Sequence, residues 1–398
     1  MRTNVSNLFC AAAVLVVGTR VLASGWTVTN LHPAGAGQSF AYGASGAQQA
    51  GFASVGGFGH ASLWSGTAAS WVDLHPAGAT GSQAYGVFGA RQVGFANISG
   101  VQRASLWNGT AASRIDLHPA GATRSEARAM AGTQQAGTAT LGGNDHAGLW
   151  SGTAASWVDL HPAGSTSSEA RAISGTQQAG LAVVMGNPHA SLWSGAAASW
   201  TDLNPAGATR STAYGIFGAQ QVGSASFGGN PVAGLWNGTA ASWTNLNPVG
   251  GGHSEAYATL GTRQAGYTAF TINNIRRPGL WSGTAASWES LPLPSGSWGD
   301  TVATSIWDDG TTLYVAGYGV NNASGGNEAL LWKRPSCPGD ANGDRGVGLA
   351  DIAIIIQQWD QTVSPGTGGD LDADGSVGLA DIAIVIQNWA INCPPLAQ

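Results

Sequence analysis

The chain has 398 residues and a net charge of −6, and only 9% of its residues are charged, whereas 43% are apolar. Ordinary domains carry about 25% charged residues, so the surface must be polar mainly through Ser, Thr, Asn and Gln. The 17 tryptophans argue against disorder, which goes with a scarcity of aromatic residues. The acidic balance does not support a nucleic-acid-binding role.

Residues 1–23 are predicted to be a secretory signal peptide. Arg2 precedes the apolar stretch Leu8–Gly18, and a small-residue cleavage site ends at Ala23. The alternative, a transmembrane anchor, needs about 20 apolar residues, and Arg20 interrupts this run too early. We therefore expect a secreted protein, extracellular or at the cell surface, with no membrane span after removal of the signal.

A repeat of about 43 residues fills most of the remaining chain. Its Leu-Trp pair occurs seven times, with successive tryptophans 43 residues apart four times and then 45 and 51 residues apart. These tryptophans are Trp64, Trp107, Trp150, Trp193, Trp236, Trp281 and Trp332. Each period holds four short β-type segments between Gly, Pro, Asn and Ser turns. In one copy they are Trp71–Leu74, Ser82–Phe88, Gln92–Ile98 and Ala104–Trp107. Four strands in about 43 residues is the size of one propeller blade.

The ends of the repeat region indicate a closed ring. The region opens with a lone strand of the Trp71–Leu74 type, at Val28–Leu31, and closes after only three strands, the last at Ala329–Trp332. The lone strand would complete the last blade and leave no half-blade with unpaired edges. We predict an all-β, seven-bladed propeller of four-stranded blades over residues 24–335, with a linear solenoid or stacked sheets as the alternative. The recurrent tryptophans are predicted to fill the wedges between blades rather than to stack on sugars at the surface.

Two strand types carry recurring motifs. One third strand reads HASLW (His60–Trp64), and one second strand reads QQAG (Gln48–Gly51). These motifs resemble those of the bacterial extracellular HAF-type repeat family, whose repeats carry a His-Ala-Phe-Leu-Trp-like strand and a Gly-Gln-x-x-Gly-like strand. The resemblance spans about residues 26–333 and implies little about function.

Residues 336–398 are predicted to form a separate acidic module. Between Cys337 and Cys393 there are eight aspartates and one basic residue, Arg345, which give a local net charge of −7. Side-chain oxygens at positions 1, 3, 5 and 12 of a loop, with the carbonyl of position 7, are the ligands of an EF-hand-type Ca²⁺ site. The two predicted ligand sets are Asp340, Asn342, Asp344, Gly346 and Asp351, and Asp370, Asp372, Asp374, Ser376 and Asp381. Each loop leads into an apolar helix, Asp351–Trp359 or Asp381–Trp389. We expect two Ca²⁺ ions; an acidic turn pair that binds nothing is the alternative.

This paired loop–helix arrangement resembles a type I dockerin, the Ca²⁺-binding module that binds cohesins. The resemblance covers residues 338–390 and implies a cohesin-like or cell-surface partner protein. Position 6 of the first loop is Arg345, where Gly375 in the second matches the left-handed backbone need, so we expect the first site to be weaker. Cys337 and Cys393 flank the module and are expected to form a disulfide in an oxidising environment; two free thiols are the alternative.

Two rings of side chains recur at blade spacing. The first consists of His32, His75, His118 and His161, with Asn204 and Asn247 in the next two copies. Because a metal ring would not accept Asn so freely, this pattern favours turn capping. The second, on the predicted innermost strand, consists of Tyr42, Tyr85, Arg128, Arg171, Tyr214 and Tyr257. Since an unpaired charge is costly in a dry core, we hypothesise that the second ring lines a partly wet channel mouth for a glycan or protein ligand; packing between blades is the alternative.

The sequence shows no catalytic constellation, so we expect no catalytic residues and no enzyme activity. Three of the five glutamates, at 126, 169 and 255, occupy equivalent positions in the repeat, which favours a structural role. The resulting prediction is a secreted, non-enzymatic binding or scaffold propeller, attached through its Ca²⁺-dependent module to a cohesin-like or cell-surface partner. The alternatives are a component of an extracellular polysaccharide-degrading enzyme, because dockerins often accompany polysaccharide breakdown, and a structural protein of the cell envelope.

Overall fold

The structure, a computed structural model, describes residues 25–342, 346–363, 368–372 and 375–390. The predicted signal peptide (1–23), the predicted Ca²⁺ ligands Asp344 and Asp374, and Cys393 lie outside the described residues. Within the described ranges, no helix has both the length and the apolar character that a membrane crossing requires.

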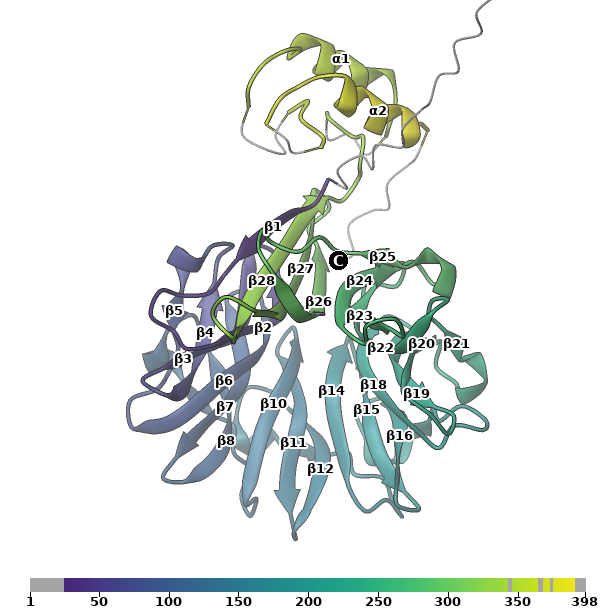
Figure 1. Cartoon of the computed structure of the whole chain (residues 1–398). Coiled ribbons are helices and arrows are strands. Elements are labelled where there is room, and N and C mark those ends of the chain that lie inside the picture. Colours follow the sequence, from purple (N-terminus) through teal and green to yellow (C-terminus); the bar gives the residue numbers. More distant parts are fainter. Residues whose placement is uncertain (1–24, 343–345, 364–367, 373–374, 391–398) are drawn as a thin grey trace, which may run out of the picture.

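Seven antiparallel sheets of four strands each surround a common centre (Figure 1). The innermost strands are β2 (Ser39–Ser45), β6 (Ala79–Phe88), β10 (Arg124–Ala131), β14 (Ser168–Ser174), β18 (Arg210–Phe217), β22 (Gly251–Thr259) and β26 (Trp298–Asp308). The second strands are β3 (Gln48–Val55), β7 (Arg91–Ile98), β11 (Gln134–Leu141), β15 (Gln177–Val184), β19 (Gln220–Ser226), β23 (Gln264–Phe270) and β27 (Thr312–Asn321). Each innermost strand contacts the innermost strands of both neighbouring blades, and β2 contacts β26, so the ring is closed.

The outer half of each blade follows the same order. The third strands are β4 (Phe58–Trp64), β8 (Val101–Trp107), β12 (Asn144–Trp150), β16 (Asn187–Trp193), β20 (Val232–Trp236), β24 (Arg276–Trp281) and β28 (Gly326–Pro335). The outermost strands are β5 (Val72–Asp73), β9 (Ile115–Asp116), β13 (Val158–Asp159), β17 (Thr201–Asp202), β21 (Thr244–Asn245), β25 (Glu289–Ser290) and β1 (Thr27–Asn30). The predicted seven-bladed, four-stranded propeller is therefore confirmed.

The seventh blade is closed by the first strand of the chain, as the sequence predicts. Its order is β1-β28-β27-β26, and Thr27 to Asn30 pair antiparallel with Lys333 to Leu330. A side-chain clasp adds to this pairing just before β1. The indole Nε1 of Trp26 donates to Glu289 at 2.7 Å, Arg334 stacks 4.4 Å from the centroid of a Trp26 ring, and Arg334 Nη1 pairs with Glu289 at 2.6 Å.

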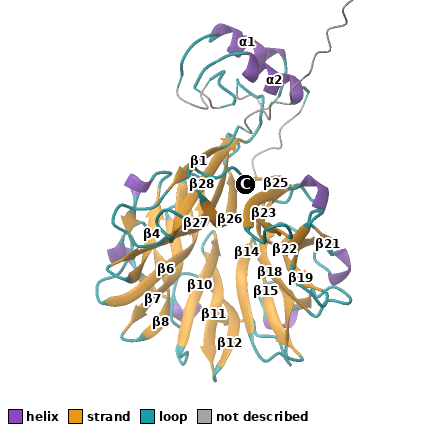
Figure 2. Ribbon diagram, in the orientation of Figure 1, coloured by secondary structure: helices purple, strands orange, loops and turns teal. Residues whose placement is uncertain are grey.

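Apart from β1, the outermost strands have two residues each and are shorter than predicted. The predicted strand Trp71–Leu74 is only Val72–Asp73, and a 3₁₀ turn, Ala68–Ser70, precedes it. Equivalent turns are Ala111–Ser113, Ala154–Ser156, Ala197–Ser199, Ala240–Ser242 and Ala285–Ser287. Figure 2 shows such short helices at the rim of the ring. In the first of them the Ser70 hydroxyl accepts from Ser65 N at 2.8 Å and donates to Thr67 O at 2.6 Å, so a serine side chain holds the turn closed.

The third-strand tryptophans form the core, as predicted. All seven have no exposed surface. Trp107 packs with Leu63 and Leu74 of the preceding blade and with Ala84 and Val87 of its own. A fully buried tryptophan removes about 150–250 Å² from water, so these rings supply much of the cohesion between blades.

The histidine and asparagine ring joins consecutive blades. His75 places Nδ1 2.8 Å from Ser82 Oγ and Nε2 3.0 Å from the Ala79 carbonyl, and Ser82 Oγ accepts from Ala61 N of the preceding blade at 2.9 Å. Because the Ala79 carbonyl can only accept, Nε2 carries a proton, and because burial lowers the pKa of His75, the imidazole is neutral at neutral pH and Nδ1 accepts from the serine hydroxyl. Asn204 makes the same two contacts through its amide oxygen and nitrogen, which explains why Asn replaces His in two copies.

The C-terminal module contains two short helices, α1 (Leu349–Gln357) and α2 (Leu379–Gln387), which begin and end two residues earlier than predicted. They lie beyond the seventh blade in Figure 1. The small core of this module contains Cys337, Val347, Ile355, Leu371, Val377 and Val385.

Candidate functional site

Every innermost strand carries a β-bulge at the same place. In β14, for example, the pairing with β15 skips from Ala170 to Ala172, and Arg171 is the extra residue. A bulge changes the direction in which a side chain points. The bulge residues of the seven blades are Tyr42, Tyr85, Arg128, Arg171, Tyr214, Tyr257 and Thr304. The first six are the ring predicted from the sequence, and Thr304 is its seventh member.

Thr304 was missed because the repeat spacing lengthens before the last blade. A local signal was available, since alanine precedes the bulge residue in all seven blades and a small residue follows it, as in Ala303-Thr304-Ser305. Repeat spacing alone was the wrong guide where an insertion intervenes.

A glycine on the second strand makes each bulge possible. Gly180 of β15 pairs with Ala170, and a Cβ placed on it would lie 1.9 Å from the carbonyl oxygen of Glu169. The equivalent glycines would place a Cβ between 1.8 and 2.1 Å from a carbonyl oxygen of the innermost strand; they are Gly51, Gly94, Gly137, Gly223, Gly266 and Gly317. Glycine in the Gln-Gln-x-Gly motif is therefore required by close approach of two backbones.

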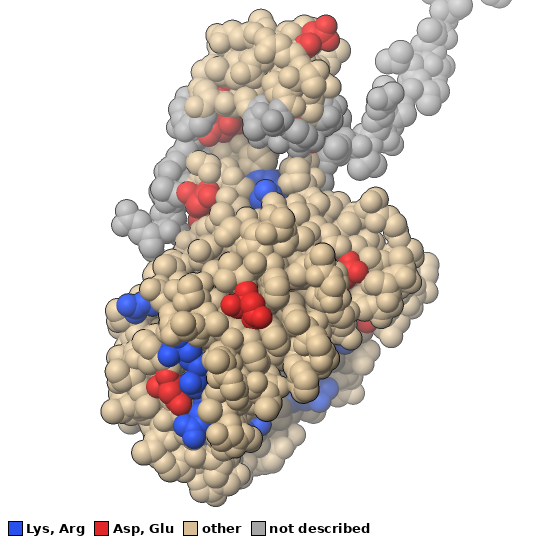
Figure 3. Space-filling view, turned by 90° about the vertical axis from the view of Figure 1, so that its left-hand side faces the viewer, with Lys and Arg blue, Asp and Glu red and all other residues tan. Residues whose placement is uncertain are grey.

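The seven bulge side chains line one cavity of about 400 Å³, together with Gln83 and Tyr318. All seven are half-buried. Charged side chains are sparse on the surface, as Figure 3 shows for one face, and two of the arginines line this cavity. The predicted ring residues thus converge on a single cavity.

The two arginines are adjacent in ring order and are bordered by tyrosines. The Cζ atom of Arg128 lies 5.3 Å from the centroid of Tyr85, and that of Arg171 lies 5.4 Å from Tyr214. Their Nη2 atoms pair with Glu126 at 2.5 Å and with Glu169 at 2.7 Å, respectively. Both Nε atoms are buried and have no acceptor among the described residues.

Arg128 keeps its charge, and the tyrosines keep their protons. Burial opposes the charge on Arg128, but the Glu126 carboxylate and other neighbours outweigh it and raise the pKa of Arg128. Burial raises the pKa of Tyr42, Tyr85 and Tyr257 well above the usual value. The cavity therefore offers guanidinium and hydroxyl donors at neutral pH.

Serine–histidine pairs at hydrogen-bond distance recur in the blades, but they do not form a nucleophilic site. Ser82 Oγ and His75 Nδ1 are 2.8 Å apart. However, Ser82 is only 1% exposed, and its histidine donates to a backbone carbonyl rather than to a carboxylate. A serine nucleophile needs access to substrate and a base oriented by a third group, so we assign no catalytic residue among the described residues.

The second predicted Ca²⁺ loop places acidic side chains together. Asp370, Asp372 and Asp381 bring carboxylate oxygens within 4.8 Å of one another. Asp381 is 1% exposed, and its carboxylate accepts from Leu371 N at 2.6 Å and from Gly378 N at 2.7 Å. This hard-oxygen donor set fits Ca²⁺.

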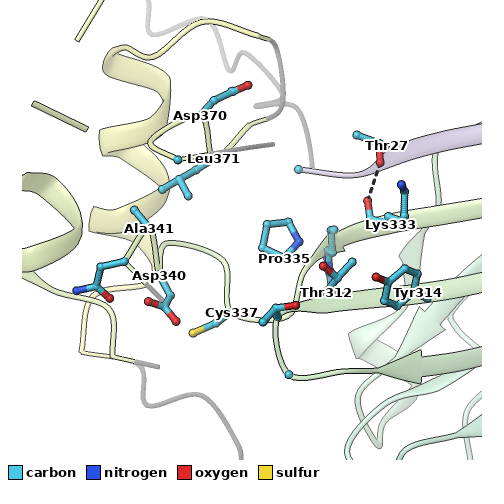
Figure 4. A pocket seen from close by; sticks show the side chains of 16 residues that line it. Thr27, Thr312, Tyr314, Lys333, Pro335, Cys337, Asp340, Ala341, Asp370 and Leu371 are labelled. Atoms are coloured by element: carbon cyan, nitrogen blue, oxygen red, sulfur yellow. Dashed lines mark hydrogen bonds between the residues drawn. The ribbon is translucent and has the colours of Figure 1, made fainter. Parts of the chain in front are cut away.

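The first loop is described in part. Asp351 is 1% exposed and accepts from Asn342 N at 3.1 Å and Gly348 N at 2.8 Å, in the same manner as Asp381. Asp340 and Asp370 both line a cavity of about 530 Å³ where the module meets the propeller, and Figure 4 shows it between the module and Thr27, Lys333 and Pro335. Cys337 is buried and disulfide-bonded. Because Cys393 lies outside the described residues, the predicted pairing stays a prediction.

No protein-family model and no curated protein matches this sequence. Its fold is similar to that of several solved structures. A puromycin hydrolase complexed with PGG has a TM-score of 0.52 at 12% identity, over 73% of this chain and 53% of that chain. A puromycin-hydrolyzing peptidase of Mycobacterium tuberculosis has a TM-score of 0.50 at 14% identity, over 75% of this chain and 54% of that chain. The β-propeller domain of the Trilobed protease from Pyrococcus furiosus has a TM-score of 0.50 at 10% identity, over 74% of this chain and 97% of that domain.

This chain spans about half the length of the two puromycin-hydrolysing chains, and at these identities the likeness establishes the shared fold. The matches nevertheless contradict the prediction of a non-enzymatic scaffold, because chains with this fold include hydrolases and peptidases. The prediction relied on the lack of a recognised catalytic constellation in this sequence, but the matched hydrolase and peptidase chains share this fold over about half of their length. We withdraw it.

Proposed function

We propose that the propeller is the substrate-binding part of a peptide-processing enzyme, and that it holds a peptide carboxylate between Arg128 and Arg171. The observation that carries this proposal is the convergence of the seven bulge residues on one cavity, with two guanidinium groups from neighbouring blades. Each guanidinium pairs with its own glutamate and keeps a buried Nε without an acceptor among the described residues. A ligand carboxylate would bind the exposed part of the two guanidinium groups, whose side chains are 27% and 25% exposed, and such charge-assisted bonds are strong.

The cavity's size and walls support a small ligand. Its volume of about 400 Å³ falls in the usual range for ligand sites, about 300–1,000 Å³. Tyr85 and Tyr214 border the arginines and offer apolar ring surface to the rest of the ligand. The shared fold with puromycin-hydrolysing chains makes a peptide the first ligand class to test.

Calorimetric titration of the full chain with Ala-Ala-Ala and with its C-terminal amide tests the proposal. We expect the free carboxylate to bind about tenfold or more tightly than the amide, because hydrogen bonds to charged groups contribute about 1.5–3 kcal/mol. Arg171→Gln should abolish this difference, whereas Arg91→Gln, an exposed arginine outside the ring, should preserve it. Equal binding of both peptides would overturn the peptide assignment. Binding of tri-galacturonate, a carboxylate-bearing sugar, without binding of either peptide would overturn it too.

We also propose that residues 336–398 are a dockerin-like module that binds two Ca²⁺ ions and a cohesin-like or cell-surface protein. Its two helices support this by presenting matched apolar side chains to solvent. Leu349 and Ile356 on α1 are 75% and 60% exposed, and Leu379 and Ile386 on α2 are 76% and 60% exposed. Exposed apolar patches of this kind mark protein interaction sites. Pull-down with a purified cohesin in Ca²⁺ and in EDTA tests this; capture that persists in EDTA would contradict it.

Finally, we propose that the protein is secreted and acts outside the cell or at its surface. The signal-like residues 1–23 and the HAF-type motifs support this proposal. Expression with the native N-terminus, followed by mass spectrometry of the culture fraction, tests this. A mature chain that begins at Ser24 is the expected product, and retention of an intact Met1 in the cells would contradict the proposal.

A further inference from the structure

Glutamate occupies the same position in three blades, two residues before the bulge residue. Glu126 and Glu169 are each paired with the arginine that follows them in the ring. At Glu255 the bulge residue is Tyr257 instead, and no Lys, Arg or His nitrogen among the described residues lies within 4.0 Å of the carboxylate. Glu255 therefore carries a negative charge that no ion pair compensates. It lines a smaller, neighbouring cavity, which shares Tyr214 with the cavity of the bulge residues.

The cations nearest to this part of the ring are engaged elsewhere. Arg276 stacks 5.0 Å from the centroid of Tyr267, and its Nε lies 3.9 Å from Asp300. Arg210 lines a smaller cavity of about 230 Å³ together with Glu255, but its Nε donates to Ser226. The Glu255 charge is thus held by neutral donors alone.

Those donors are tyrosines, which form an aromatic wall around the carboxylate. The hydroxyl of Tyr257 donates to Glu255 Oε2 at 2.6 Å, and that of Tyr214 donates to Oε1 at 3.4 Å. The Tyr214 and Tyr257 centroids are 5.1 Å apart, and Tyr267 lies 6.0 Å from Tyr257. Aromatic faces attract ammonium groups, so a carboxylate among tyrosines is a suitable place for an organic cation.

We propose that Glu255, with Tyr214 and Tyr257, binds the α-ammonium group of the ligand whose carboxylate lies at Arg128 and Arg171. This inference rests on the proposed function and narrows it to short peptides with both ends free. Tyr214 links the two subsites, since Arg171 stacks on its ring and its hydroxyl donates to Glu255. The opposite charges are therefore separated by about one tyrosine side chain, and an extended peptide advances about 3.3–3.6 Å per residue, so a dipeptide or tripeptide fits.

The test compares Ala-Ala-Ala, N-acetyl-Ala-Ala-Ala and the C-terminal amide, titrated into the full chain at pH 7, where the α-amino group is largely protonated. We expect the free peptide to bind about tenfold or more tightly than its N-acetyl form. Glu255→Gln should remove this preference, because the amide is neutral. Asp300→Asn is the matched control, since it makes the same charge change outside the cavity at a half-exposed side chain, and should leave the preference intact.

The outcomes separate the two proposals. If the amide binds weakly while the N-acetyl and free peptides bind equally, the carboxylate site stands and the ammonium site is wrong. If the Glu255→Gln variant still binds the free peptide more tightly than its N-acetyl form, the ammonium site is also wrong. If none of the three peptides binds, the proposed function fails and this inference fails with it.

Discussion

Gly180→Ala should destabilise the propeller, because the bulge on β14 leaves no room for a side chain at this position. The added Cβ would lie 1.9 Å from the Glu169 carbonyl oxygen, whereas real Cβ contacts essentially never fall below 3.0 Å. The obstacle is a backbone atom, so no side-chain rotation relieves it. Strand β14 would have to move more than 1 Å away from β15, against a normal interstrand spacing of about 4.7–4.9 Å.

The cost follows from two terms. Overpacking of this kind costs about 1–3 kcal/mol, and each ladder hydrogen bond that is weakened adds up to about 0.5–1.5 kcal/mol. We expect the free energy of unfolding to fall by about 2–4 kcal/mol. At roughly 2–4 °C per kcal/mol for a large domain, the melting temperature should fall by about 5–15 °C.

Urea unfolding followed by tryptophan fluorescence measures the effect, since the third-strand tryptophans are fully buried in the folded ring. Gly229→Ala is the matched control, because a Cβ there meets no atom within 4 Å and the backbone does not have a positive φ. A Gly180→Ala variant within about 0.5 kcal/mol of the wild type, the range of neutral surface substitutions, would refute the bulge argument. An equal loss in Gly229→Ala would refute it as well.

Three further predictions concern pH, closure and metal. Burial lowers the pKa of His75 and His161 below the usual 6.5. Their contribution to stability is therefore complete above pH 6.5 and is lost as the pH falls through the range between 6.5 and the lowered values. The urea midpoints at pH 7.5 and 5.5 should differ less in His75→Asn, which keeps both hydrogen bonds, than in the wild type, and an equal difference would count against this network. Deletion of residues 25–30 removes β1 and exposes the edge of β28, so size-exclusion chromatography should show self-association. An unchanged monomer of full stability would contradict a role for β1 in closing the ring. EDTA should make the C-terminal module sensitive to trypsin and chymotrypsin while the propeller stays resistant, because Asp370 and Asp381 are buried with their charges close together and repel each other without a cation. Asp381→Asn should show the same sensitivity in the presence of Ca²⁺. Equal protection with and without EDTA would contradict a metal site.

The ring architecture could be predicted because it depends on periodicity and on the offset of one strand. The spacing of the Leu-Trp pairs and the lone strand at Val28–Leu31 were sufficient, and β1 does pair with β28. The short 3₁₀ turns could not be anticipated in the same way. Their Ala-Ala-Ser segments recur at blade spacing, but three residues are too few to show a helical pattern of apolar residues. Each turn is closed by a serine hydroxyl that bonds to the backbone at both sides.

The details of the site were less accessible from sequence. The six recurrent ring positions were evident, but their convergence depends on the bulges, and the lack of an ion pair at Glu255 depends on which basic groups the fold brings near its carboxylate. Some side-chain orientations turn on a single neighbouring atom. Trp71 Nε1 donates to Ser62 Oγ at 2.8 Å, whereas Trp157 lies over Gly148, where a Cβ would be 2.0 Å from its ring. Such alternatives are decided by local packing rather than by pattern.

The pairing of the first strand with the last sheet also delays the closure of the ring during synthesis. Thr27 and its partner Lys333 are 306 residues apart in the chain. At about 5–20 residues per second, β1 waits on the order of 15–60 s during synthesis before its partner emerges. During that interval the β1 segment of one nascent molecule can pair with the β28 edge of another, and exchanged dimers built in this way would be more frequent when many ribosomes translate the same message.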